Sequence, residues 1–158
     1  MRSLLRRLAA LAAGLTFVAF AARVGAETQD CHGEPSASKV YITVEGVRSD
    51  HGFVVANVYG DDRRRFLADN GWLNVWRDPA QKGEVTMCLY VPEPGSYAVV
   101  VFHDANGDGV LNMGAFGPRE GYGFSNNVRP FLSAPSLRSV SFPVSEGVTR
   151  LRIRLRYP

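Results

Sequence analysis

Hydrophobic and polar residues alternate along most of this chain with the two-residue period of a β-strand. The clearest case is 150–157, where four arginines alternate with apolar residues, so that one face suits a core and the other suits water. Similar short runs recur between turn residues, and almost no segment repeats with the period of a helix. Strands are predicted at 40–47, 53–59, 72–76, 85–91, 97–103, 139–144 and 150–157.

One of these segments, 97–102, is apolar on both faces, which predicts a central strand that is covered on both sides. We therefore expect an all-β fold: a two-sheet antiparallel β-sandwich, immunoglobulin-like or prealbumin-like, of about seven strands with one long ordered loop. A single helical turn is expected at 61–68, because Asp61 and Asp62 suit the start of a helix.

Residues 1–26 have the pattern of a removable signal peptide. Three arginines precede an apolar run at 8–22, and small residues follow at 24–26. The alternative, a retained membrane anchor, is weaker because the run is shorter than the ~20 residues that a spanning helix needs. The expected organisation is a signal peptide at 1–26, a polar tail at 27–38 and a single β-sandwich domain at 39–158. Such a protein would be periplasmic or secreted, with no membrane span once the signal is removed.

Removing the signal peptide changes the charge of the chain. The whole sequence has 18 Lys and Arg against 15 Asp and Glu, but four of the arginines lie before Glu27. The remaining 14 basic residues and 15 acidic residues give a formal net charge of −1. Nucleic acid is therefore a poor partner on grounds of both charge and compartment. An unknown protein or glycan of the cell envelope is expected instead.

Cys31 and Cys88 are the two cysteines of the chain, and in an oxidising compartment they are expected to form a disulfide. Alternation in 85–91 places Val85, Met87 and Leu89 on one face and Cys88 on the other. Cys88 should therefore lie on the more open face, where a bridge to Cys31 would hold the amino-terminal tail against the strand.

The segment from Asp104 to Asn112 has the oxygen spacing of a calcium-binding loop. Side-chain oxygens occupy its first, third, fifth and ninth positions, and glycine occupies the sixth. Val110, at the seventh position, would contribute its backbone carbonyl oxygen. The predicted ligands in this segment are Asp104, Asn106, Asp108, Val110 and Asn112.

The twelfth position, where an EF-hand loop has a bidentate glutamate, is Ala115 in this chain. Glu120 is the expected replacement if the chain folds back, and the small number of charged ligands predicts a weak affinity, roughly 10⁻⁴ to 10⁻³ M. One alternative is a metal-free turn, since Asn-Gly and Asp-Gly are also strong turn signals. Another is a transition-metal site, which is disfavoured because His32, His51 and His103 show no paired spacing.

The aromatic and amide residues after Glu120 are candidate partner-binding residues. Tyr122 and Phe124 would either stack on a sugar or pack the loop onto the sandwich. Asn126 and Asn127 would either contact a partner or bond to the loop backbone. Ser125 lacks the second glycine of a nucleophile elbow, so catalysis is not expected there.

Several of these segments together resemble a known family. They are the signal peptide, Gly-Ser-Tyr-Ala at 95–98, His-Asp-x-Asn-x-Asp-Gly at 103–109, Glu-Gly-Tyr-Gly-Phe-Ser-Asn-Asn at 120–127 and the closing strands. The chain is similar to the bacterial secreted family called domain of unknown function 2141 over nearly the whole mature chain, most specifically at 120–127. The resemblance implies a small β-sandwich without an assigned activity.

These patterns lead to one expectation about function and two alternatives. We expect a secreted or periplasmic, non-enzymatic β-sandwich in which weakly bound calcium orders a surface for a protein or glycan of the envelope. The first alternative is a metal-free structural or assembly module of the cell envelope. Hydrolase activity is the second and is less favoured, because no catalytic set is visible.

Overall fold

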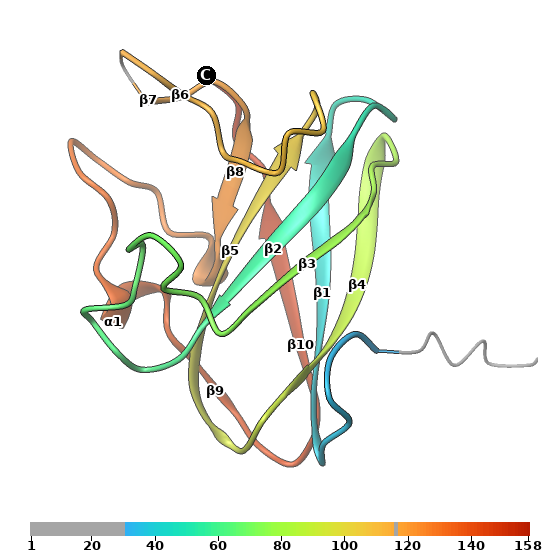
Figure 1. The fold of residues 1–158 in the computed structure, drawn as a ribbon, viewed down its shortest axis with the longest axis vertical. Coiled ribbons are helices and arrows are strands. Elements are labelled where there is room, and N and C mark those ends of the chain that lie inside the picture. The colour runs from blue at the N-terminus through green and yellow to red at the C-terminus, as the bar shows by residue number, and fades with distance from the viewer. Residues whose placement is uncertain (1–30, 116) are drawn as a thin grey trace, which may run out of the picture.

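The alternating segments form strands in two sheets that pack face to face (Figure 1). The structure is a computed structural model that describes residues 31–115 and 117–158. The predicted signal peptide and the first residues of the predicted tail lie outside the described residues. The all-β prediction is confirmed, because the described elements are strands apart from two short helical turns.

The smaller sheet has the strand order β10-β1-β4. Its strands are β1 (Ser38–Val47), β4 (Gly83–Val91) and β10 (Gly147–Arg154). β1 runs antiparallel to β4, as predicted for the fold as a whole, but it runs parallel to β10. The parallel pair joins the first and the last strand of the domain, and the long chain between them leaves room for the crossover that parallel pairing requires.

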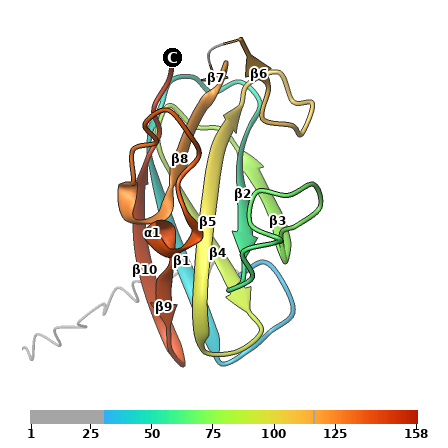
Figure 2. The same ribbon diagram turned by 90° about the vertical axis from the view of Figure 1, so that its left-hand side faces the viewer.

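The larger sheet is antiparallel and has the order β3-β2-β5-β8, with β9 paired to the start of β5. Its strands are β2 (Phe53–Tyr59), β3 (Asn74–Pro79), β5 (Gly95–Asp104), β8 (Gly121–Phe124) and β9 (Phe142–Val144). A small hairpin, β6 (Met113–Gly114) with β7 (Gly117–Pro118), lies at one end of the sandwich in both views (Figures 1 and 2).

The central strand β5 is covered on both faces, as its apolar sequence predicts. Tyr97, Val99 and Val101 point into the core between the two sheets. Ala98 and Val100 face the other way, into a second cluster. That outer cluster is completed by the segment after β8, which contains the 3-10 turn η1 (Ser125–Asn127) and the short helix α1 (Leu137–Val140). The strand that leads into the candidate calcium loop is therefore the most enclosed strand of the domain.

Two predicted elements need correction. The strand expected at 139–144 begins as helix α1, because Ser136 caps a turn by accepting a hydrogen bond from the Ser139 N–H and because Leu137 and Val140 bury one side of it. The strand expected at 72–76 is β3, displaced towards the carboxyl end, since Trp72 packs against the outer cluster instead of joining the ladder.

The segment expected to make a helical turn, 61–68, forms consecutive hydrogen-bonded turns in which Phe66 N donates to Asp62 O at 3.0 Å. These residues are all described, and none of them lies in a helix. Across the described part of the chain, no helix is long and apolar enough to cross a membrane.

The amino-terminal tail runs beside the free edge of β4. His32 N donates to Cys88 O, and Tyr90 N donates to His32 O, both at 2.8 Å. The predicted disulfide between Cys31 and Cys88 is confirmed, with a Cα–Cα distance of 4.5 Å. Cys88 is fully buried and not on an open face, because the tail covers it.

Candidate functional site

The candidate loop begins at the buried end of β5. His103 Nδ1 lies 2.8 Å from the Tyr157 hydroxyl, and His103 Nε2 lies 2.9 Å from the His51 carbonyl oxygen. His103 and Asp104 are both almost completely buried. The first residue of the loop therefore has a fixed position, which a binding site requires.

The Asp104 carboxylate organises the turn that follows it. Its Oδ1 accepts hydrogen bonds from Gly107 N at 2.8 Å and Asp108 N at 3.1 Å, and its Oδ2 accepts one from Gly109 N at 2.8 Å. Gly107 and Gly109 have φ values of 75° and 79°, a region that favours glycine. Three backbone N–H groups thus occupy three of the roughly four lone-pair positions of this carboxylate.

Asn106, Asp108 and Asn112 form a triangle of mutual hydrogen bonds above this turn. Asn106 Nδ2 lies 2.8 Å from Asp108 Oδ2 and 3.0 Å from Asn112 Oδ1. Asn112 Nδ2 lies 3.0 Å from the same Asp108 oxygen. The partly positive amide nitrogen of Asn106 thus lies between two oxygens, which is where a cation held by these side chains would lie.

The hydrogen bonds of the triangle also change the acidity of its carboxyl group. The Asn112 amide, followed by the Val110 N–H and the Asn106 amide, holds the pKa of Asp108 below its ordinary value. The cause is direct stabilisation of the ionised carboxylate. Asp108 is therefore charged at neutral pH and available to a cation.

Glu120, the expected replacement for the missing twelfth ligand, folds back onto the loop. Its Oε2 accepts a hydrogen bond from Asn112 N at 3.0 Å, and its Oε1 accepts one from Ala105 N at 3.3 Å. Arg119 N also donates to Asn112 O at 2.8 Å, which closes the return path. The carboxylate thus joins the two ends of the candidate loop.

Two features limit what the loop can bind. The Arg77 guanidinium lies against Gly109, where a Cβ would come within 2.9 Å of it, and this positive charge opposes a cation. Within 31–115 and 117–158, no three His, Cys, Asp or Glu side chains gather as they would around a metal ion. Any cation site here would depend on amide and backbone oxygens beside the carboxylates.

The candidate partner-binding residues are mostly used inside the molecule. Phe124 is buried in the outer cluster, and Tyr122 packs against that cluster and makes an edge-to-face contact with Phe124 at 5.9 Å. Asn126 Nδ2 donates to the Ser139 and Ser141 carbonyl oxygens at 3.1 and 2.8 Å. Asn127 Oδ1 accepts from Arg154 N at 2.8 Å.

Ser125 has a structural position. Its hydroxyl is fully buried, accepts a hydrogen bond from Val99 N at 3.0 Å and donates to Val140 O. It therefore ties the turn after β8 to the central strand and to α1. Both partners are backbone groups, so neither of them is a general base that would activate the hydroxyl.

The candidate loop and the return path through Glu120 lie in the part of the chain that matches a known protein family. The model of a family described as "Uncharacterized protein conserved in bacteria (DUF2141)" matches residues 42–152, which include the candidate loop and the return path through Glu120. The chain belongs to this family. No curated protein matches the chain, and no solved structure matches it.

Two features of this DUF2141 chain were missed by sequence reasoning. A Cβ on Gly121 would lie 2.3 Å from the Tyr157 ring, and a Cβ on Gly123 would lie 2.8 Å from Arg154 O, so the two glycines let β8 lie close to the C-terminal residues. The second feature is a pocket between β3 and the amino-terminal tail. Its walls come from segments about forty residues apart, which periodicity cannot bring together.

Proposed function

We propose that this protein is a secreted or periplasmic, non-enzymatic binding module in which weakly bound calcium orders a surface for a protein or glycan of the cell envelope. The observation that carries the proposal is the position of Glu120. Its carboxylate bonds to the backbone at both ends of Asp104–Asn112, so a carboxylate stands near the loop where Ala115 offers none. Export rests on the pattern of residues 1–26.

The triangle of side chains would need little rearrangement to accept an ion. Asp108 Oδ2 and Asn112 Oδ1 already face the Asn106 nitrogen, so a rotation of the Asn106 side chain that moves this nitrogen away would leave two oxygens directed at the point that it now occupies. The Asp108 oxygen is charged, and Val110 would add its carbonyl oxygen. Because Arg77 is close and only three of the six predicted ligands are carboxylates, the affinity belongs to the weak range of extracellular modules, roughly 10⁻⁴ to 10⁻³ M.

A second candidate, a metal-free structural or assembly module, is favoured by a different observation. The Asp104 carboxylate already accepts three backbone hydrogen bonds, so the turn is satisfied without an ion. In this case the segment after β8 serves only to cover the outer face of β5. Identical melting in calcium and in chelator would favour this module over the first candidate.

Thermal melting with calcium chloride and with chelator tests the calcium proposal. At about ten times the dissociation constant, binding adds about 1.4 kcal/mol to the free energy of unfolding. That raises the Tm of a domain of this size by about 3–5 °C. An Asp108→Asn variant should lose this shift while it keeps the Asp104 turn, since the Asp108 side chain is exposed.

Asp69→Asn provides the matched control, because Asp69 is an exposed aspartate outside the loop. This variant should keep the full calcium-dependent shift. The proposal is wrong if the unsubstituted protein shows no shift, or if Asp108→Asn shows the same shift as Asp69→Asn.

A further inference from the structure

The loop between η1 and α1 has two apolar side chains that the fold leaves in solvent. Phe131 is 84% exposed and Leu132 is 94% exposed, and they are the most exposed large hydrophobic residues that the structure describes. In Figure 1 this loop extends away from the two sheets on the left of the view. We call Phe131 and Leu132 the apolar tip. Single exposed apolar residues are common, but two adjacent ones at the end of a projecting loop point to a partner that surrounds them.

The backbone of Leu132 has a conformation that leucine disfavours. Its φ is 62°, in the left-handed region, where a side chain with a Cβ is strained and glycine or asparagine is usual. Phe131 and Ser133, on either side of it, form an isolated antiparallel bridge, so the chain reverses direction at Leu132. Because the side chain is almost fully exposed, it gains no packing inside the molecule that would offset this strain. Strain without a benefit to the fold indicates a role outside the fold.

The base of the loop is fixed to the sandwich, so the apolar tip keeps its position. On one side of the tip Val128 packs against the outer cluster, and on the other side Leu137 of α1 is buried in that cluster. Pro130 and Pro135 restrict φ close to the tip on both sides. A tip that is already ordered loses little conformational freedom when it enters a partner, which favours affinity.

The charge beside the tip indicates what kind of partner it fits. Arg129 precedes the tip and Arg138 follows it in α1, and both are exposed and without an ion pair among the described residues. From 121 to 145 the chain has these two arginines and no Lys, Asp or Glu, which gives a charge of +2. The loop 61–70, which also packs on the outer cluster, has three arginines and three aspartates and leaves this balance unchanged. An anionic partner is therefore favoured.

An anionic lipid surface meets both requirements. Its hydrocarbon region accepts apolar side chains of any shape, and its phosphate groups lie just outside that region, where arginines beside an inserted tip would meet them. A protein partner would instead need an apolar pocket of matching shape with acidic groups around its rim. The projecting shape of the tip and the positive charge beside it thus favour a lipid bilayer.

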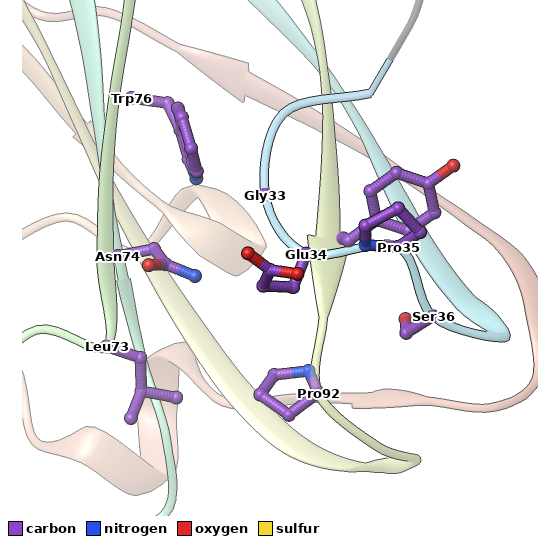
Figure 3. Close-up of a pocket in the computed structure, with 9 residues that line it drawn as sticks. Gly33, Glu34, Pro35, Ser36, Leu73, Asn74, Trp76 and Pro92 are labelled. Atoms are coloured by element: carbon purple, nitrogen blue, oxygen red, sulfur yellow. The ribbon is translucent and has the colours of Figure 1, made fainter.

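Other parts of the surface do not combine these two properties. The pocket between β3 and the amino-terminal tail includes the Glu34 carboxylate, and none of the described residues that line it is Lys or Arg (Figure 3). An anionic headgroup there would meet a like charge without a compensating cation. On the smaller sheet, Arg152 and Arg154 are both paired with Glu45, which offsets part of their charge.

We propose that Phe131 and Leu132 insert into the interface of an anionic lipid bilayer, with Arg129 and Arg138 at the level of the lipid phosphates. The protein then attaches to a membrane surface reversibly, through one loop and without a spanning segment. This contact uses no residue of Asp104–Asn112, so it does not depend on calcium in that loop.

Co-sedimentation with vesicles tests this proposal. The chain without residues 1–26 is used, because that apolar segment would bind vesicles by itself and every described strand and helix lies after it. The protein is mixed with sucrose-loaded vesicles of phosphatidylglycerol and phosphatidylcholine in equal parts, and with vesicles of phosphatidylcholine alone. It should bind the anionic vesicles at least about fivefold more tightly than the neutral ones, and raised salt should weaken this binding.

A pair of leucine variants separates insertion from folding. Leu132→Asn removes the apolar side chain and relieves the backbone, because asparagine tolerates a positive φ. It should keep or raise the Tm and weaken binding to the anionic vesicles at least about tenfold, the loss expected for one buried leucine. Leu67→Asn is the matched control, because Leu67 also has a positive φ, 59°, but is only 40% exposed and lies in another loop. This variant should leave vesicle binding unchanged.

A pair of arginine variants tests the charge in the same way. Arg129→Gln should weaken binding to the anionic vesicles about fivefold. Arg150→Gln should not change it, because Arg150 is an exposed arginine on β10, away from the loop. The proposal is overturned if the unsubstituted protein does not sediment with the anionic vesicles, if it binds neutral vesicles equally well, or if the two variants of either pair bind alike.

Discussion

At the scale of single residues, the ionisation of Asp108 makes the hydrogen bonds of the candidate loop depend on pH. Its carboxylate is stabilised in the ionised form by the Asn112 amide first, and then by the Val110 N–H and the Asn106 amide, so its pKa lies below the ordinary value of 3.8. A carboxyl group with a lowered pKa in the folded state contributes stability above its unfolded pKa, and that contribution is lost as the pH falls through the folded pKa. The hydrogen bonds of the triangle should therefore persist below the ordinary pKa of 3.8 and break only as the pH falls through the lowered pKa.

We predict that Asn112→Ala moves the pKa of Asp108 up towards its ordinary value, because it removes the largest stabilising hydrogen bond. The side-chain carboxyl carbon of Asp108, followed by NMR from pH 7 to pH 2, reports this pKa directly. Asn70→Ala, at an exposed asparagine in another turn, should not change it. An Asp108 titration midpoint that is the same in both variants would show that the triangle does not exist in solution.

At the scale of elements, β8 joins the two sheets along one side of the sandwich. It pairs with β5 in the larger sheet, and its Tyr122 exchanges two backbone hydrogen bonds with Arg156, at 2.9 and 2.8 Å, just after β10 of the smaller sheet. Gly123 faces Arg154 O and Ile153 Cγ2 so closely that a Cβ would lie 2.8 Å from each. The close approach of β8 and β10 thus depends on a residue without a side chain.

Gly123→Ala should therefore lower the free energy of unfolding by about 1–3 kcal/mol, since the extra methyl group forces backbone apart in a packed region. Urea denaturation followed by tryptophan fluorescence measures the change. Gly95→Ala is the matched control, because Gly95 also lies in a strand and a Cβ there would meet Tyr97 at an ordinary 3.5 Å. Equal stability of the two variants would contradict a close contact at Gly123.

Single strands were predictable from the sequence, whereas their partners were not. Alternation in 150–157 identified the buried face of β10, but periodicity does not tell which strand lies beside it. The short helix α1 was missed because one turn with two buried residues, Leu137 and Val140, has the same apolar content as a strand. Glu120 was predicted as the carboxylate that would replace the one missing at Ala115 if the chain folds back. The pocket at Trp76 needed the position of a tail that tertiary contacts alone determine.

At the scale of the whole molecule, the disulfide ties the tail to the sandwich across a sequence separation of 57 residues. Closing a loop of this length restricts the unfolded chain and contributes about 4 kcal/mol in the chain-entropy model. We predict that the Cys31→Ser and Cys88→Ser double variant loses stability of about this size and no longer responds to reductant in thermal melts. If the unsubstituted protein melts at the same temperature with and without reductant, the bridge does not form or does not stabilise the fold.

The parallel pairing of β1 with β10 also determines when the domain can be completed. Ser38 pairs with Gly147, and Glu45 pairs with Arg154, so the middle strand of the smaller sheet has no neighbour on one side until the last residues of the chain arrive. Contacts so distant in sequence form slowly. A chain that is synthesised from its amino terminus therefore keeps this sheet open on one side until β10 has been made.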